Sequence, residues 1–249
     1  MSRYFLEVAY KGTNYSGFQV QQNANSIQAE VEHAIQILQK EKITLTGSSR
    51  TDAGVHALQN FLHFDFEGEL PSHFTYKMNA ILPPDIAIQK LIPVNSGAHC
   101  RFDAVTREYK YFIYRYKSPF LKDTAYYFPY KLNMDLLEQA AETIRNYDDF
   151  SSFSKRNTQA KTFICHISES KWYCENDRLV FYVVADRFLR GMVRALVATM
   201  LKIGRGKMTV DELKDIIEKK DSARASFAVP GHGLFLIAVN YPHDYFPTK

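Results

Sequence analysis

Two hydrophobic periodicities alternate along this chain, and their alternation constrains the fold more than any other feature. Apolar and polar residues alternate over residues 3–10, which is the period of a β-strand. A polar, glycine-containing loop follows at residues 11–17. Apolar residues then recur at helical spacing, which predicts a helix that begins near Ser26, with Asn25 and Gln28 as its capping pair.

The same two patterns continue to the end of the chain. Strands are predicted at 43–46, 58–66, 86–92, 107–116, 161–173, 179–185 and 234–239. Helices are predicted within 71–82 and at 133–145, 188–203 and 209–220, the last with Thr209 and Glu212 as a capping box. The fold class is therefore α+β, with two similar-sized halves of sheet and helix at residues 1–105 and 106–249.

Composition limits the kinds of protein that this chain can be. The net charge is +4 and the pI is 8.8, which permits a polyanionic partner without demanding one. The cysteines Cys100, Cys165 and Cys174 form no close pair, which indicates a reducing compartment, and no metal-ligand spacing is present. We interpret Cys165 and His166 as buried structure. No apolar run approaches the ~18 residues of a membrane span, so we expect a cytoplasmic protein without a membrane partner.

The loop at residues 47–56 presents reactive groups where a predicted strand ends. Arg50, Thr51 and Asp52 offer a guanidinium, a hydroxyl and a carboxylate within three positions. The aspartate is an anion at neutral pH and can act as a nucleophile or base in a cleft. Taken alone, the loop is more often a simple turn in which Asp52 is an Asx-turn or helix-cap residue and Arg50 is its surface partner.

Three arginines fall on one stripe of the predicted helix at 188–203 or just before it. Arg187, Arg190 and Arg194 have helical spacing in an otherwise apolar segment. An arginine that is buried there needs an anion, either a carboxylate such as Asp52 or an RNA phosphate. The alternative is a solvated polar stripe, which fits Arg194 less well because it lies deeper in the apolar run.

Aromatic and basic residues also alternate in the predicted strand at 107–116. Tyr109 and Tyr111 share a face with arginines, which suits base stacking combined with phosphate contact. A sheet face of β-favouring tyrosines explains the same pattern. Two basic loops, at 155–161 and 202–207, could contact phosphates or be merely solvated.

Together these segments resemble the TruA family of tRNA pseudouridine synthases over nearly the whole chain. The most specific similarity is the segment from Arg50 to Ala57, which matches the active-site motif of the family. Other ordered similarities lie at 10–28, 79–83, 101–104, 109–111, 188–194 and 233–242. The resemblance implies two α+β halves with a central basic RNA-binding cleft, a homodimer, and no cofactor or metal.

The resemblance also implies residue roles. Asp52 would be the nucleophile, Tyr109 would pack on the target base, and Arg194 would pair with Asp52 and hold it ionised. Arg50 would help to displace the target nucleotide. The further residues expected to contact RNA are Arg187, Arg190 and His56. The chain departs from the family pattern at Ser49, where glycine is usual, and at Lys11 and Phe18.

We therefore expect a tRNA pseudouridine synthase acting on the anticodon stem-loop, at positions about 38, 39 and 40. One alternative is a non-catalytic RNA-binding or chaperone protein of the same fold. Another is a synthase with shifted tRNA site specificity. A third, a hydrolase that uses Asp52 with His56, lacks a signal for its substrate site.

Overall fold

The computed structural model describes residues 1–155, 160–221 and 225–246. The chain divides into two compact units. Unit 1 comprises Met1–Val105 with Leu236–Lys249, and unit 2 comprises Thr106–Phe235. The predicted boundary left residues 236–249 in the second half, whereas residues 236–246, the described part of this segment, belong to unit 1. The predicted α+β fold class is confirmed: the described residues combine mainly antiparallel strands with five α-helices.

Unit 1 is built on a sheet in the order β4-β1-β3-β9, with the short β2 beside β3. β1 lies between β3 and β4 and pairs antiparallel with both, and β2 pairs antiparallel with β3. The register of β1 against β3 shifts between Val8 and Tyr10, next to the loop that carries Asp52. The strand bounds are β1 Ser2–Tyr10, β2 Thr46–Gly47, β3 His56–Phe66, β4 Ile86–Val94 and β9 Leu234–Asn240.

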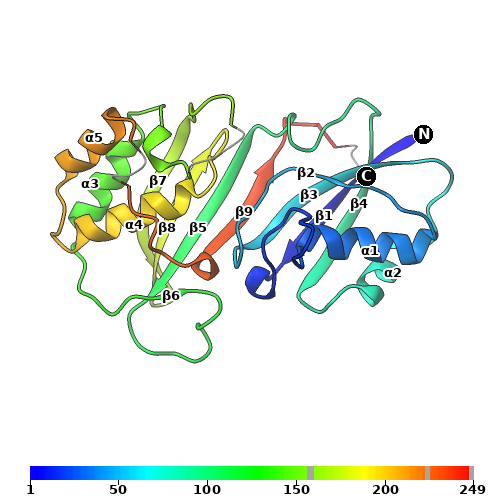
Figure 1. The fold of residues 1–249 in the computed structure, drawn as a ribbon, viewed down its shortest axis with the longest axis horizontal. Helices are drawn as coiled ribbons and strands as arrows, with labels where there is room; N and C mark the ends of the chain where they lie inside the picture. The colour runs from blue at the N-terminus through cyan, green and yellow to red at the C-terminus, as the bar shows by residue number, and fades with distance from the viewer. Residues whose placement is uncertain (156–159, 222–224, 247–249) are drawn as a thin grey trace. The chain divides into compact units, whose positions relative to one another are not determined.

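Both faces of the unit 1 sheet are covered. Helices α1 (Ile27–Gln39) and α2 (Phe74–Ile81) lie over one face (Figure 1). On the sheet, Phe5 and Phe61 contact aromatic rings of the closing segment, among them Tyr241 and Phe246. This second layer explains why consecutive residues of β1 are buried although the sequence alternates. The N-cap of α1 is Ser26, which accepts the N–H of Ala29, and not the predicted Asn25.

Unit 2 has a sheet in the order β5-β8-β7, with β6 pairing in parallel with β5. β8 pairs antiparallel with both neighbours, so it forms the centre of this sheet. Tyr109 pairs with Val183, and Tyr111 pairs with Phe181. The strand bounds are β5 Thr106–Tyr114, β6 Tyr126–Tyr127, β7 Ile167–Glu175 and β8 Arg178–Ala185.

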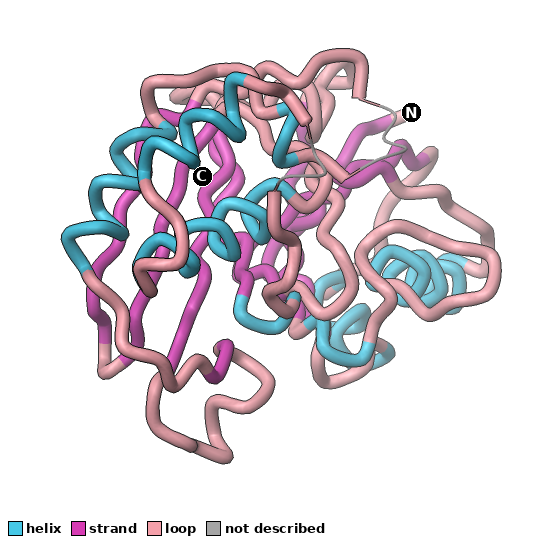
Figure 2. Tube along the Cα trace, turned by 60° about the vertical axis from the view of Figure 1, so that its left-hand side comes forward, coloured by secondary structure: helices cyan, strands magenta, loops and turns pink. Residues whose placement is uncertain are grey.

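Three helices lie on one side of the unit 2 strands, as Figures 1 and 2 both show. They are α3 (Met134–Ile144), α4 (Met192–Gly204) and α5 (Val210–Glu218). Nearly every residue of α4 is buried, and Trp172 on β7 donates its indole N–H to the sulfur of Met200. The predicted capping box of α5 is confirmed, with Thr209 and Glu212 bonding reciprocally.

The structure corrects two sequence interpretations. Helix α4 begins at Met192, so residues 188–191 and Arg187 lie outside it. Gly191 stops the helix from extending backwards because its φ of +77° lies in the left-handed region. His166 is exposed and pairs with Asp148, although Cys165 is buried as predicted.

Two smaller differences concern strand and loop bounds. The strand predicted at 161–173 starts only at Ile167. The first three residues of the loop predicted at 202–207 are the last three residues of α4. Within the basic loop at 155–161, residues 156–159 lie outside the described part of the chain. Among the helices of the described residues, none is long and apolar enough to cross a bilayer.

Candidate active site

Hydrogen bonds from Asn60 on β3 hold the loop that carries Asp52. The buried amide of Asn60 accepts the hydroxyl of Ser48 at 2.8 Å and donates to the carbonyl oxygen of Ser49 at 2.9 Å. It also donates to the Tyr10 hydroxyl at 3.2 Å. That hydroxyl lies 2.9 Å from the Thr51 hydroxyl. A chain of hydrogen bonds therefore holds Ser48, Ser49 and Thr51, three of the four residues before Asp52, in place.

Two glycines of the opening loop allow the backbone to press against the same segment. A Cβ atom on Gly12 would lie 2.0 Å from the carbonyl oxygen of Val55. Gly17 has φ +115°, and a Cβ there would lie 3.0 Å from the carbonyl oxygen of Thr51. The N–H of Phe18 donates to that Thr51 oxygen at 3.1 Å. The loop after β1 thus forms a backbone wall against the Asp52 loop.

His56 occupies the first position of β3 and is only 1% exposed. Its Nδ1 accepts the backbone N–H of Gly12 at 3.0 Å. This bond ties the opening loop to the end of the Asp52 loop. The burial suits a supporting role better than direct contact with RNA. Arg50 is exposed, and Asp52 is partly buried.

Ser49 does not strain the loop, although glycine is usual at its position in the family that the sequence resembles. Among the described residues of the Asp52 loop, only Gly54 has a positive φ, +75°. Ser49 therefore has an ordinary backbone conformation, and its carbonyl oxygen bonds to Asn60. The side chain of Phe18 is buried against Gly47, where a Cβ would lie 2.3 Å from the ring.

In unit 2, the predicted stacking residue Tyr109 lies on β5 and is 7% exposed. Its ring meets Phe188 edge to face, with 5.0 Å between the ring centroids. Phe188 sits in the irregular segment before α4. Tyr111, the other strand tyrosine, is fully buried and donates to the carbonyl oxygen of Pro230 at 2.9 Å. Tyr111 therefore belongs to the core, as the sheet-face interpretation predicted.

Arg194 lies in the first turn of α4 and is partly buried. Its Nε and Nη2 atoms donate to the carbonyl oxygen of Val229 at 3.0 and 2.8 Å. These two bonds orient the guanidinium. Its charge also opposes the effect of burial, which raises the pKa of Tyr111 far above its ordinary value.

The three arginines do not form the helical stripe that their spacing suggested. Arg187 is partly buried and Arg190 is exposed, and both precede α4. Arg107 supports this segment by donating to the carbonyl oxygen of Asp186 at 2.8 Å. Lys155 donates its backbone N–H to the carbonyl oxygen of Arg190 at 3.0 Å. Unit 2 thus holds Arg187 and Arg190 on an anchored loop.

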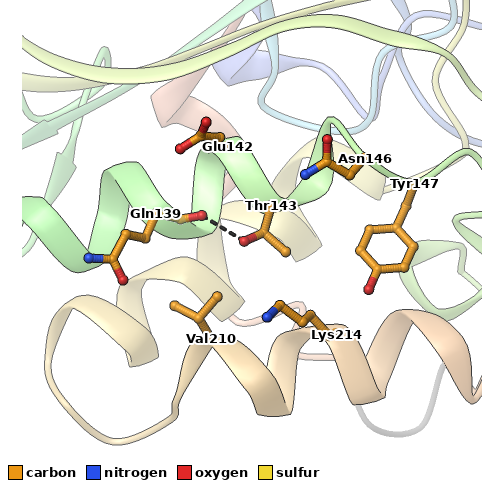
Figure 3. Close-up of a pocket in the computed structure, with 7 residues that line it drawn as sticks. All are labelled: Gln139, Glu142, Thr143, Asn146, Tyr147, Val210 and Lys214. Atoms are coloured by element: carbon orange, nitrogen blue, oxygen red, sulfur yellow. Dashed lines mark hydrogen bonds between the residues drawn. The ribbon is translucent and has the colours of Figure 1, made fainter.

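A cavity of about 560 Å³ lies between α3 and α5 and contains none of the predicted site residues (Figure 3). Three of its polar side chains bond within the protein. Thr143 donates to the carbonyl oxygen of Gln139, Tyr147 to Glu218, and Lys214 to Asp211.

Unit 1 also gathers His63, His99 and Cys100, whose donor atoms all lie within 4.8 Å of one another. Sequence spacing did not reveal this group because the first two lie 36 positions apart. However, His99 Nδ1 accepts the backbone N–H groups of Arg101 and Phe102. The proton of the neutral imidazole then resides on Nε2, which cannot ligate a metal in that form. The geometry fits a hydrogen-bonded core cluster.

A family model described as tRNA pseudouridine synthase matches residues 7–103 and 147–242. The chain belongs to the tRNA pseudouridine synthase family. The predicted resemblance is therefore confirmed, and the protein is an isomerase.

Full-length relatives carry the same similarity. The chain is 44% identical over 252 residues to tRNA pseudouridine synthase A of Parabacteroides distasonis, with all of both chains covered. It is 38% identical over 239 residues to the protein of that name from Bacillus subtilis, covering 94% of this chain and 97% of the relative.

Sequence reasoning missed the residues that position the Asp52 loop. Asn60, Tyr10 and Gly12 carry no reactive signal, and Asn60 looked like one polar residue of an alternating strand. Full burial with several hydrogen bonds distinguishes Asn60, and only the fold reveals that burial.

Proposed function

We propose that this protein isomerises uridine to pseudouridine in the anticodon stem-loop of tRNA, at positions about 38, 39 and 40. The observation that carries the proposal is the rigidly held loop with Asp52, in a chain that belongs to the tRNA pseudouridine synthase family. Preorganised side chains of this kind suit a reaction in which geometry supplies much of the rate.

The reaction needs few chemical groups. The N1–C1′ bond breaks, the base turns, and a new bond joins C5 to C1′. The C5 proton leaves and N1 gains a proton, so the reaction involves no net oxidation or hydrolysis. Asp52 is the nucleophile in this proposal. Its attack on C1′, its addition to C6 and its removal of a 2′ proton are the three routes open to it.

The other site residues have distinct roles in the proposal. Tyr109, held edge to face by Phe188, packs on the target base. Arg194, oriented by Val229, pairs with Asp52 and favours its ionised form. Arg50 helps to displace the target nucleotide from its stem, because an inserted cation offsets part of the unstacking cost.

Arg187 and Arg190 contact RNA phosphates in this proposal, from their anchored loop before α4. His56 supports the Asp52 loop through Gly12. We also propose a cytoplasmic homodimer, in which two copies of the site serve a substrate as large as tRNA. Static light scattering of the purified protein measures this oligomeric state.

The decisive assay is release of tritium from tRNA labelled at C5 of uridine. The intact protein should release tritium, and Asp52→Asn should not, because the amide cannot act as an anionic nucleophile. Asp135→Asn, on the exposed first turn of α3, is the matched control and should keep full activity. Transcripts with cytidine at position 38, 39 or 40 identify which uridines react.

Two outcomes would contradict the proposal in different ways. Full activity of Asp52→Asn would exclude the nucleophile while leaving the reaction. Tight tRNA binding by the intact protein without tritium release would favour a non-catalytic RNA-binding protein of the same fold.

A further inference from the structure

A second, smaller cavity lies within unit 1 beside the Asp52 loop. Its volume is about 250 Å³, and its lining includes both residues of β2 and Gln28 in the first turn of α1. Arg50, two residues before Asp52, is one of its lining residues. The cavity is smaller than the ~300–1,000 Å³ of drug-sized ligand sites, so it suits one small ring system.

One wall of this cavity is an exposed aromatic ring. Phe102 is 73% exposed, and the centroid of its ring lies 4.1 Å from the centroid of the His99 ring. The Arg101 guanidinium lies 5.8 Å from the centre of the Phe102 ring. An aromatic ring this exposed, beside a cation, gains little from the protein core and is placed to stack on a ligand.

Hydrogen bonds within the turn at residues 99–103 hold Phe102 in this position. His99 Nδ1 accepts the backbone N–H groups of Arg101 and Phe102, at 3.1 and 3.3 Å. The carboxylate of Asp103 accepts the N–H of His99 at 2.7 Å and the hydroxyl of Tyr245 at 2.6 Å. The turn therefore presents Phe102 in a defined orientation, which limits the entropy lost on binding.

The rest of the cavity combines an apolar base with polar and cationic groups. Phe18 and Leu45 are buried and supply the base. Gln28 is fixed by donating to the carbonyl oxygen of Leu45 at 2.8 Å. Gln19, Arg50 and Arg101 are exposed at its edge. An aromatic wall, an amide and two guanidinium groups match a nucleobase with its phosphates.

We propose that this cavity binds a nucleotide adjacent to the target uridine in the substrate RNA. Phe102 stacks on its base, Arg101 contacts its phosphate, and Gln19 bonds to the edge of the base. The inference rests on the proposed function for the identity of the substrate. It adds Phe102 and Arg101 as residues that select the sequence or shape around the target.

A thermodynamic cycle tests this assignment without relying on turnover. An Asp52→Asn protein is titrated with stem-loop RNAs that each carry one abasic nucleotide near the target uridine. One abasic position should weaken binding about 5- to 150-fold, the usual effect of losing a base–aromatic stack. In Asp52→Asn/Phe102→Ala the same abasic RNA should bind as well as the unmodified RNA. Phe102→Trp should restore the difference.

Tyr76→Ala is the matched control, because Tyr76 is an exposed aromatic residue on α2 in the same unit. This variant should keep the full abasic effect. Arg101→Ala should lower the salt dependence of binding by about one phosphate contact. Thermal unfolding of each variant checks that its fold is intact.

An abasic profile that Phe102→Ala leaves unchanged at every position would overturn the inference, as would absence of RNA binding. Isomerisation by the intact protein without any coupling to Phe102 would overturn this inference alone. Coupling to Phe102 in a protein that never isomerises uridine would overturn the proposed catalysis and leave the cavity assignment standing.

Discussion

At the scale of single residues, Asn60 positions the Asp52 loop although its side chain is not reactive. It has no nucleophilic or acid–base function, yet it bonds to Ser48, Ser49 and Tyr10 in the buried network under Asp52. Burial raises the pKa of Tyr10 to about 12, so its hydroxyl keeps its proton at neutral pH. Network residues of this kind determine where the carboxylate lies.

Replacing Asn60 should therefore impair both stability and turnover. Asn60→Ala leaves buried partners unsatisfied, which should lower the free energy of unfolding by about 1–3 kcal/mol. It should also lower kcat more than it raises KM, because the Asp52 loop loses its support. Denaturant unfolding and steady-state tritium release measure the two effects. Exposed Asn146→Ala is the control, and wild-type kcat in Asn60→Ala would refute the role.

The sequence pointed to the candidate reactive residues but not to the residues that hold them in position. Asp52 and Arg50 stood out only through the match of their segment to the family motif, because such a loop taken alone is more often a simple turn. Arg194 stood out because a charge in an apolar run is unusual. His56 stood out for its titratable ring, but its burial and its bond to Gly12 suit a supporting role. Burial and hydrogen-bond partners come from segments distant in sequence, so no local pattern could reveal them.

At the scale of elements, the contact between the opening loop and the Asp52 loop requires a residue without a side chain. Gly12→Ala would place a Cβ atom 2.0 Å from the Val55 carbonyl oxygen, so one of the two backbones must move. A shift of about 1 Å can cost about 100-fold in rate, and we expect a loss of kcat of that order. Tritium release under saturating tRNA measures it.

Gly97→Ala is the matched control for this prediction. Nothing lies within 4 Å of a Cβ atom at Gly97, and its φ is not in the left-handed region. It should keep wild-type activity and unfolding temperature. Equal activity of both alanine variants would show that the Asp52 loop tolerates displacement.

The capping box of α5 separates stability from function. Thr209→Ala removes the hydroxyl that accepts the Glu212 N–H at 3.1 Å, and we expect a loss of about 1 kcal/mol in stability. Thr209→Ser should keep most of it. Because none of the proposed site residues lies on α5, specific activity at low temperature should stay unchanged. A loss of activity without loss of stability would assign α5 a functional role.

Periodicity located most elements but not all of their ends. The Thr209 capping box and the bounds of α3 followed from local pattern, since caps and apolar stripes are written in adjacent residues. The start of α4 did not, because residues 188–191 have helical spacing while Gly191 adopts φ +77°. A glycine can adopt either sign of φ, so its presence in the sequence does not show that the helix starts after it.

At the scale of the whole molecule, the proposed site residues are distributed over both units. Arg50, Asp52 and His56 belong to unit 1, whereas Tyr109, Arg187, Arg190 and Arg194 belong to unit 2. The sequence indicated a boundary near residue 105 from a polar stretch. It did not reveal that residues 236–246 return to unit 1, because pairing of β9 with β3 joins segments more than 150 residues apart. Long-range strand pairing has no local signature.

The stability of the chain should decline in mild acid because of His63. Burial, with smaller effects from His99 and Arg3, lowers the pKa of His63 from 6.5 to about 4. Between these values the unfolded chain binds a proton that the folded chain does not, so protonation favours unfolding. The free energy of unfolding should fall as the pH drops from 6.5 to about 4, by up to about 1.4 kcal/mol per pH unit.

Denaturant unfolding at several pH values between about 7 and 4 tests this linkage. His63→Gln should show a shallower decline than the wild type, whereas His33→Gln, at an exposed position of α1, should not. Arg3 lowers the pKa of Asp65, and Tyr245 lowers that of Asp103. The stabilisation from these carboxylates is lost only as the pH falls below about 3.8, so it does not mask the effect of His63. Identical pH slopes for His63→Gln and wild type would show that another group controls acid unfolding.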